Sequence, residues 1–401
     1  MDDDQMGLIS LIALASEYPT QFGLTEGPMH PDEAEARHHQ NDWLHRVLTA
    51  ENPRRCKDEV GVLKPTFDAL KEAMKVSLLE VVPHCRQPSE CGDFLSLDEI
   101  IVSFLLVLMM GGGFRNAANR LGRSYASVHH SFWIAVHAFL KSVYREEVQF
   151  IPNLGAHPKI VNESKYHCFG QVRGAGDGIY IATIPYAIDK PRMMNRKGYA
   201  SQNVFALADF DLYYLFVQPG GDGCANDAQI LNHILDHRLF SLGENDRILL
   251  DAIYALRPNM LTPFRGIRYH LQEWESGQNR PQNAREIYNL RHAQLRQCIE
   301  RAFGYTYGKF RILREPLMFQ DVNKQNAIIY CIFGLHNFIL RREGIDEGQF
   351  LAPDDFVTHD IEVEPAEDLD DEAGRRTRDV IANRLWDLYL HECQTLGLPV
   401  E

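Results

Sequence analysis

The chain has 401 residues, which is room for two ordinary domains or one large domain with an appendage. Hydrophobic residues make up 45% of it and charged residues 24%, a globular mixture that excludes wholesale disorder. The net charge of −14 is uneven, because residues 1–40 carry eight acidic side chains against one arginine and residues 351–372 carry ten against none. The body between these segments is mildly basic, so the total charge does not exclude a nucleic-acid partner.

The cysteines and the apolar segments indicate the compartment. None of the eight Cys forms a CxxC pair with metal-ligand spacing, and Cys85 and Cys91 are close enough in sequence to bridge. The acidic start, Met1–Asp4, lacks the basic residues of a secretory signal, so we expect reduced thiols throughout. The longest apolar run, 100–110, is too short to span a bilayer. These features predict a protein of the cytosol or nucleus.

The N-terminal part, 41–150, is expected to be helical and to follow a weakly ordered acidic segment at 1–40. Helical periodicity and glycine breaks predict three helices, at 98–110, 114–121 and 125–144. Asp98 is expected to cap the first of these helices and Ser124 the third. This layout at about 97–144 is typical of a helix-turn-helix, although ordinary helical bundles share it.

Candidate DNA contacts lie in this predicted helix-turn-helix. In such units the first turns of the recognition helix, here the helix predicted at 125–144, reach the bases, and nearby cations contact phosphates. The candidate residues are Arg115, Arg120, Arg123, Ser124, Ser127 and His129. Only three Arg and no Lys lie within 98–140, so we expect weak DNA affinity from this unit alone.

The pattern changes to short β runs from about residue 170. Strands are predicted at 178–186, 203–209, 212–218 and 247–251, the second and third forming a hairpin. Helices are predicted at 227–238, 289–308, 323–342 and 378–396, with a polar insertion at 257–288. The order of three strands, a helix and a fourth strand fits an α/β fold with an RNase H-like mixed sheet. We expect this catalytic domain at 165–345, then an acidic linker at 346–375 and a C-terminal helix at 376–401.

Acidic residues follow the expected strands and helices at separate points. Asp177 begins the first strand between two glycines, Asp251 ends the fourth strand, and Glu300 lies on the helix 289–308. Asp227 heads the preceding helix and is a candidate fourth ligand, or a helix N-cap. Phosphodiester hydrolysis by two Mg²⁺ ions requires carboxylates from several elements. The alternative, in a chain with 55 acidic residues, is that each is a turn or cap residue.

Basic residues accompany this acidic set. Arg296 precedes Glu300 by one helical turn and follows His292 by another, so the three share a helix face. Such a face suits a phosphate-binding metal site, or else it is a solvated face with an Arg296–Glu300 ion pair. Arg301 and Lys197 are further candidates for phosphate contact.

A series of short motifs follows in order along 177–337. They are Asp177-Gly178-Ile179-Tyr180, Arg196-Lys197-Gly198 with Ser201 and Asn203, Asn226-Asp227, Leu250–Tyr254, Asn289 with His292 and Arg296, Ile299–Gly304, Lys309–Leu313, and Leu335-His336-Asn337. In this order the chain resembles the Harbinger transposases and the Harbinger transposase-derived nucleases of the DDE superfamily. The resemblance implies a divalent metal site (Mg²⁺ or Mn²⁺) of Asp177, Asp227, Asp251 and Glu300.

The resemblance also implies a function and partners. It implies a nuclear DNA endonuclease, with Asp177, Asp251 and Glu300 as catalytic residues, and a separate Myb-like DNA-binding partner. Tyr180, Asn226, Ile253 and Tyr307 depart from the family's usual residues, which affects DNA contacts and transposition more than metal binding. The alternative is a catalytically silent adaptor associated with DNA or chromatin that retains the transposase fold.

Overall fold

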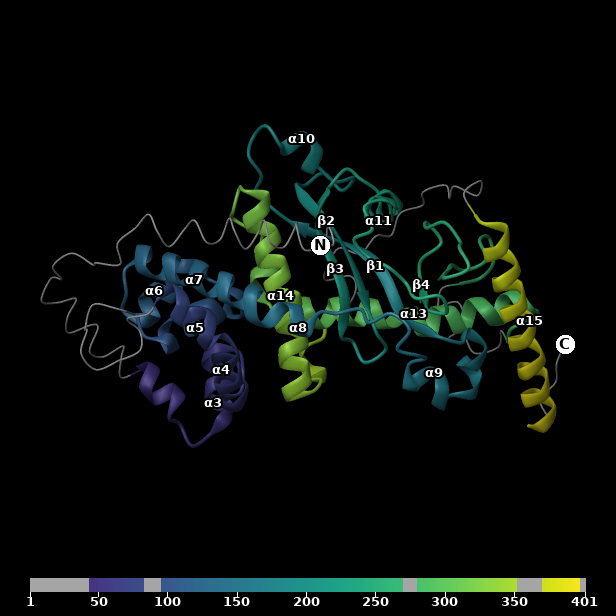
Figure 1. Cartoon of the computed structure of the whole chain (residues 1–401), viewed down its shortest axis with the longest axis horizontal. Helices are drawn as coiled ribbons and strands as arrows, with labels where there is room; N and C mark the ends of the chain where they lie inside the picture. Colours follow the sequence, from purple (N-terminus) through teal and green to yellow (C-terminus); the bar gives the residue numbers. More distant parts are fainter. Residues whose placement is uncertain (1–42, 83–94, 270–279, 352–369, 397–401) are drawn as a thin grey trace, which may run out of the picture. The chain divides into compact units, whose positions relative to one another are not determined.

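The computed structural model describes residues 43–82, 95–269, 280–351 and 370–396. Two compact units make up the chain (Figure 1), and each has its own packing. The first unit comprises the chain up to Val148, Ile181–Ser201 and Tyr305–Ala352, and the second comprises Gln149–Tyr180, Gln202–Gly304 and Pro353–Glu401. The acidic segment 1–40, most of 351–372, and Cys85 and Cys91 lie outside the described residues. The six Cys within them form no disulfide with one another.

The first unit is mainly helical. Its helices are α3 (Pro53–Val60), α4 (Lys64–Val81), α5 (Leu97–Leu105), α6 (Gly113–Leu121), α7 (Tyr125–Phe139), α8 (Arg145–Glu147), α10 (Lys190–Met193) and α14 (Val322–Glu343). Helices α5 and α7 each continue in a π-helical turn, at Leu106–Met110 and Leu140–Tyr144. The three predicted helices of 98–144 are therefore confirmed as elements. None of the helices in the described ranges is long and apolar enough to cross a membrane.

The N-cap predicted for α5 was wrong by two residues. Ser96, not Asp98, caps this helix: its hydroxyl accepts the backbone N–H of Glu99 at 3.2 Å, and the Glu99 carboxylate accepts the N–H of Ser96 at 2.7 Å. This reciprocal capping box satisfies two backbone donors at once, which a lone Asp98 does not.

A five-stranded mixed sheet has the order β3-β2-β1-β4-β5. Its strands are β1 (Val172–Ala182), β2 (Ser201–Ala208), β3 (Tyr214–Asp222), β4 (Arg247–Leu249) and β5 (Met260–Leu261). The predicted hairpin is confirmed, since β2 pairs antiparallel with β3, while β4 is parallel to both β1 and β5. The short β5 lies where a polar insertion was predicted.

Helices cover both faces of this sheet in the second unit. Helix α11 (Asp227–Asp236) packs on one face, where Ile230 and Ile234 share an apolar cluster with Phe205 and Leu250. Helix α13 (Ala284–Lys309) packs on the other face; its Phe303 ring lies 6.2 Å from that of Tyr214. The predicted first strand, 178–186, was misplaced, because β1 spans Val172–Ala182 and Asp177 lies within it rather than at its start. Two covered faces bury nearly the whole strand, so a local alternation of polar and apolar residues does not mark its ends.

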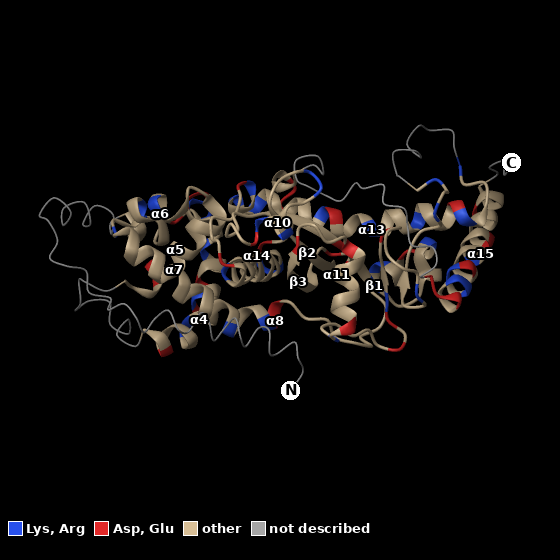
Figure 2. Cartoon of the chain, turned by 90° about the horizontal axis from the view of Figure 1, so that it is seen from above, with Lys and Arg blue, Asp and Glu red and all other residues tan. Residues whose placement is uncertain are grey.

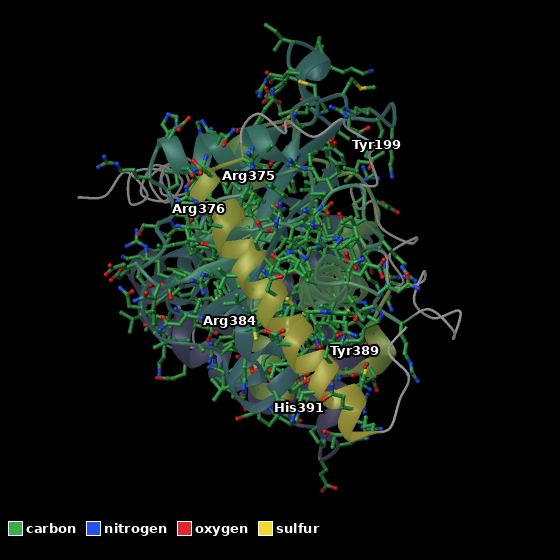
Figure 3. All side chains as sticks on the ribbon, turned by 90° about the vertical axis from the view of Figure 1, so that its right-hand side faces the viewer. Tyr199, Arg375, Arg376, Arg384, Tyr389 and His391 are labelled. Carbon is green, nitrogen blue, oxygen red and sulfur yellow. The ribbon has the colours of Figure 1, made fainter. Side chains whose placement is uncertain are left out.

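Helix α15 (Glu372–Thr395) belongs to the second unit. It begins six residues before the start predicted at 378. A Cβ on Gly374 would lie 2.9 Å from the carbonyl carbon of Arg257, so the helix backbone packs directly on this loop. Arg378 fixes the same end by donating to the Pro263 carbonyl at 2.9 Å. The exposed side chains of α15 are mixed in charge. Arg375, Arg376, Arg384 and His391 (Figure 3) are accompanied by Glu372, Asp379, Asp387 and Glu392.

Candidate active site

Asp177 is the buried centre of the site. It lies on β1 with 7% of its surface exposed, between Gly176 and Gly178. One carboxylate oxygen accepts the backbone N–H of Gly178 at 2.9 Å, and the other accepts Nη1–H of Arg296 at 2.7 Å. A buried carboxylate in this position requires a cation beside it.

Arg296 connects β1 with α13. Its second terminal nitrogen, Nη2, donates to Glu300 Oε1 at 2.6 Å, one turn further along the same helix. Only 11% of the Arg296 side chain is exposed, so the alternative of a solvated helix face is wrong for this residue. One guanidinium thus bridges two of the three predicted catalytic carboxylates.

Asp251 follows β4, the parallel neighbour of β1, and its Oδ1 accepts the N–H of Ala252 at 2.7 Å. The negative charge of Asp251 acts on Asp177. Burial raises the pKa of Asp177 to about 6, Arg296 opposes this rise, and the charges of Asp251 and Glu300 add to it. The structure therefore places Asp177, Asp251 and Glu300, which come from three separate elements, within electrostatic range of one another.

A hydrogen-bonded chain holds Arg296 from behind. Its Nε–H donates to the Tyr269 hydroxyl at 3.0 Å, which in turn lies 3.3 Å from His292 Nδ1. His292 is fully buried, and burial lowers its pKa to about 4, so the ring is neutral at physiological pH. Its Nε2 faces the Leu261 carbonyl at 3.0 Å and must be the donor there. Nδ1 is consequently an acceptor, and the Tyr269 hydroxyl donates to it.

Asp227 approaches β1 from the other side. A Cβ on Gly178 would lie 2.3 Å from Asp227 Oδ1, so this carboxylate packs directly on the strand. Consecutive residues of a strand face opposite sides of the sheet, which places Asp227 opposite the Asp177 side chain. Asn203 holds it there with a 2.6 Å hydrogen bond from Nδ2 to Oδ1. Asp227 is not the helix cap, because Asn226 caps α11 by accepting the N–H of Gln229.

The carboxylates of the site are the hard oxygen ligands that a divalent metal prefers. The buried Tyr254 hydroxyl makes no hydrogen bond within the described ranges, and the charges of Asp227, Asp177 and Asp251 add to the burial that raises its pKa. The negative charges of these carboxylates thus act on a buried hydroxyl that has no hydrogen-bond partner among the described residues. However, no three His, Cys, Asp or Glu of the described residues are arranged to hold a metal as they stand. Arg296 lies between two of the candidates.

Most of the candidate DNA contacts in the first unit have partners within the protein. Arg123 pairs with Glu99 at 2.8 Å, with side chains 4% and 6% exposed, and Arg120 pairs with Glu59 at 3.0 Å. Ser124 caps α7 through the N–H of Ser127, and the two hydroxyls lie 2.9 Å apart. His129 accepts from the Trp133 indole, and burial lowers its pKa. Arg115 is exposed.

Lys197 lies in the connection between β1 and β2, which exposes four cations, Lys190, Arg192, Arg196 and Lys197 (Figure 2). Arg192 is paired with Asp189 at 3.1 Å. The buried Asn195 organises this turn: its carbonyl oxygen accepts the N–H of Lys197 at 3.0 Å, and its amide donates to Ser201 at 3.0 Å. Arg301, on α13, is exposed.

The mixed sheet is compatible with a nuclease domain, and part of the chain is similar to one nuclease family. Residues 180–337 match the family model described as DDE superfamily endonuclease, which confirms the resemblance predicted from the motifs. This match contains Asp227, Asp251, Arg296 and Glu300 and begins three residues after Asp177.

A curated relative covers part of the chain. Protein ALP1-like of Arabidopsis thaliana is 24% identical over 158 residues, which is 36% of each of the two chains. The chain thus spans about a third of the length of this relative. No solved structure matches the chain.

The residues that sequence reasoning missed are Asn203, Tyr254 and Tyr269. Asn203 belongs to a recognised motif, and its position after Arg196-Lys197-Gly198 was the available signal. Tyr269 lies in a segment predicted as a polar insertion, where nothing in the local pattern marks it.

Proposed function

We propose that this chain is a transposase-derived DNA endonuclease that depends on Mg²⁺ or Mn²⁺ and uses an RNase H-like catalytic domain. The observation that carries the proposal is that the charges of Asp251, after β4, and Glu300, on α13, both act on the buried Asp177 of β1. The match of residues 180–337 to DDE superfamily endonucleases supports the same chemistry.

The metal would supply the activation of water and the stabilisation of charge on the leaving oxygen. Asp177, Asp251 and Glu300 would hold it. Asp227, predicted as a fourth ligand, lies on the other side of β1 from the Asp177 side chain, so we do not propose it as a ligand of the same ion. The chain itself fixes Asp177 on a buried strand, with Arg296 beside it. Strand transfer and a nuclear location remain predictions of the family resemblance.

DNA contact is proposed for the exposed turn around Lys197 in preference to the predicted helix-turn-helix. Lys190, Arg196 and Lys197 are exposed on a turn that Asn195 fixes, whereas Arg120 and Arg123 of the helical region are paired with carboxylates. A helical region with few available cations is consistent with the predicted Myb-like partner supplying further DNA affinity.

Cleavage of supercoiled plasmid DNA tests the proposal. The full chain is incubated with Mg²⁺ or Mn²⁺ beside Asp177→Ala, Glu300→Ala and the exposed control Glu244→Ala. We expect metal-dependent nicking by the wild type and Glu244→Ala, and none by the other two variants. Folded wild-type protein that neither cleaves DNA nor binds metal would favour the catalytically silent adaptor instead.

A further inference from the structure

The position between two site carboxylates is occupied by a side chain of the protein itself. Arg296 donates from Nη1 to Asp177 on β1 at 2.7 Å and from Nη2 to Glu300 at 2.6 Å. A divalent ion shared by the same two carboxylates would need the oxygens that these N–H groups occupy. The guanidinium and the ion therefore compete for one position.

This contact differs from an ordinary surface ion pair in how firmly it is held. Both hydrogen bonds are charge-assisted, and Nε is fixed separately by the Tyr269 hydroxyl at 3.0 Å. Tyr269 is in turn oriented by the buried His292. All three nitrogens of the guanidinium are thus engaged by the protein, so the side chain is fixed in its place.

The two carboxylate partners are not equally buried. The side chain of Asp177 is 10% exposed and that of Glu300 is 32% exposed. An approaching ion therefore meets Glu300 first, and the Arg296–Glu300 contact is the one that solvent can replace most readily.

We propose that Arg296 fills the cation position of the metal-free site, and that a divalent ion binds only when it displaces this guanidinium from Asp177 and Glu300. The inference rests on the proposed function, because it takes these carboxylates as the metal ligands. Tyr269 retains the displaced arginine through Nε, so Arg296 stays close to the site. The measured metal affinity is the intrinsic affinity reduced by the fraction of molecules in which the guanidinium has moved away.

Binding of Mn²⁺ to the full-length protein tests this displacement without any cleavage assay. Titration calorimetry and the electron paramagnetic resonance signal of free Mn²⁺ give the affinity of each variant. Arg296→Ala is expected to bind Mn²⁺ about tenfold or more tightly than the wild type, on the scale of one charge-assisted hydrogen bond. Arg291→Ala is the matched control: it removes a cation from the same helix whose partner is Gln294, and should leave the affinity unchanged.

Tyr269→Phe provides a second variant that changes no charge. It removes the acceptor of Arg296 Nε and should tighten Mn²⁺ binding by a smaller factor, which also decides the matter if Arg296→Ala does not fold. Wild-type affinity in both variants, or weaker binding, would overturn the displacement while leaving a metal-dependent nuclease intact. A lack of Mn²⁺ binding by all the folded proteins would overturn the displacement and the metal site together.

Discussion

Replacing Asp177 by Asn should remove one part of the pH dependence of the protein's stability and abolish its proposed activity. Burial raises the pKa of Asp177 from 3.8 to about 6, so the folded state resists ionisation of this carboxyl more than the unfolded chain does. Folded wild-type protein therefore loses stability as the pH rises from about 4 to 6, and the loss persists above that range. At 1.36 kcal/mol per pKa unit the loss is about 3 kcal/mol at pH 7.5 and about 1 kcal/mol at pH 4.5. Asn has nearly the same shape and cannot ionise.

Urea unfolding of both proteins at pH 7.5, 6.0 and 4.5, in the presence of a chelator, measures this difference. Relative to the wild type, Asp177→Asn should gain about 2 kcal/mol between pH 4.5 and pH 7.5. The cost of losing an acceptor for Arg296 or Gly178 is the same at each pH and does not affect this change. The exposed Asp236→Asn is the control and should show no such trend. A stability difference between the two proteins that does not change with pH, or that moves in favour of the wild type as the pH rises, would refute a raised pKa of Asp177.

Three further predictions concern packing and buried charge. Gly178→Ala should cost about 1–3 kcal/mol in a urea titration, because its Cβ would lie 2.3 Å from Asp227 Oδ1; wild-type stability would contradict that packing. Arg123→Ala should lower the free energy of unfolding by about 3–5 kcal/mol, because it leaves Glu99 buried without its cation. A variant that stays stable and loses only DNA binding would instead show that Arg123 contacts phosphate. Burial raises the pKa of Asp209 to about 7, so wild-type stability falls between about pH 4 and 7. Asp209→Asn should remove that fall when thermal unfolding is followed across pH, and an unchanged pH profile would count against it.

The sequence predicted correctly those helices and strands whose caps, glycine breaks and apolar periodicity all lie within one short segment. The hairpin of β2 and β3 and the helices α6, α7 and α14 lie close to their expected bounds, because glycine breaks, caps and apolar periodicity define each of them. The strand β5 was missed, since two residues, Met260 and Leu261, carry no periodicity of their own. Their strand character comes from pairing with β4.

Sequence spacing predicted that His292, Arg296 and Glu300 share a face of α13, but it did not predict what that face meets. Arg296 is buried because Asp177 lies 119 residues earlier in the chain and Tyr269 lies 27 earlier, and both bind it. Such contacts depend on the sheet order, which brings β1 against α13. The choice between a solvated ion pair and a bridging guanidinium therefore required the fold.

The same dependence explains the motif that contains Asn203. The sequence offered it as part of a family pattern without a role, and offered Asp227 as either a ligand or a cap. In the structure Asn226 caps α11, which leaves the Asp227 carboxylate available, and Asn203 then fixes that carboxylate against β1 at 2.6 Å. Gly178 has no side chain because the carboxylate occupies that space. Three motifs far apart in the chain thus meet at one acidic group. The departure from the family at residue 226 supplies a cap that accepts a backbone N–H, so it preserves the position of Asp227.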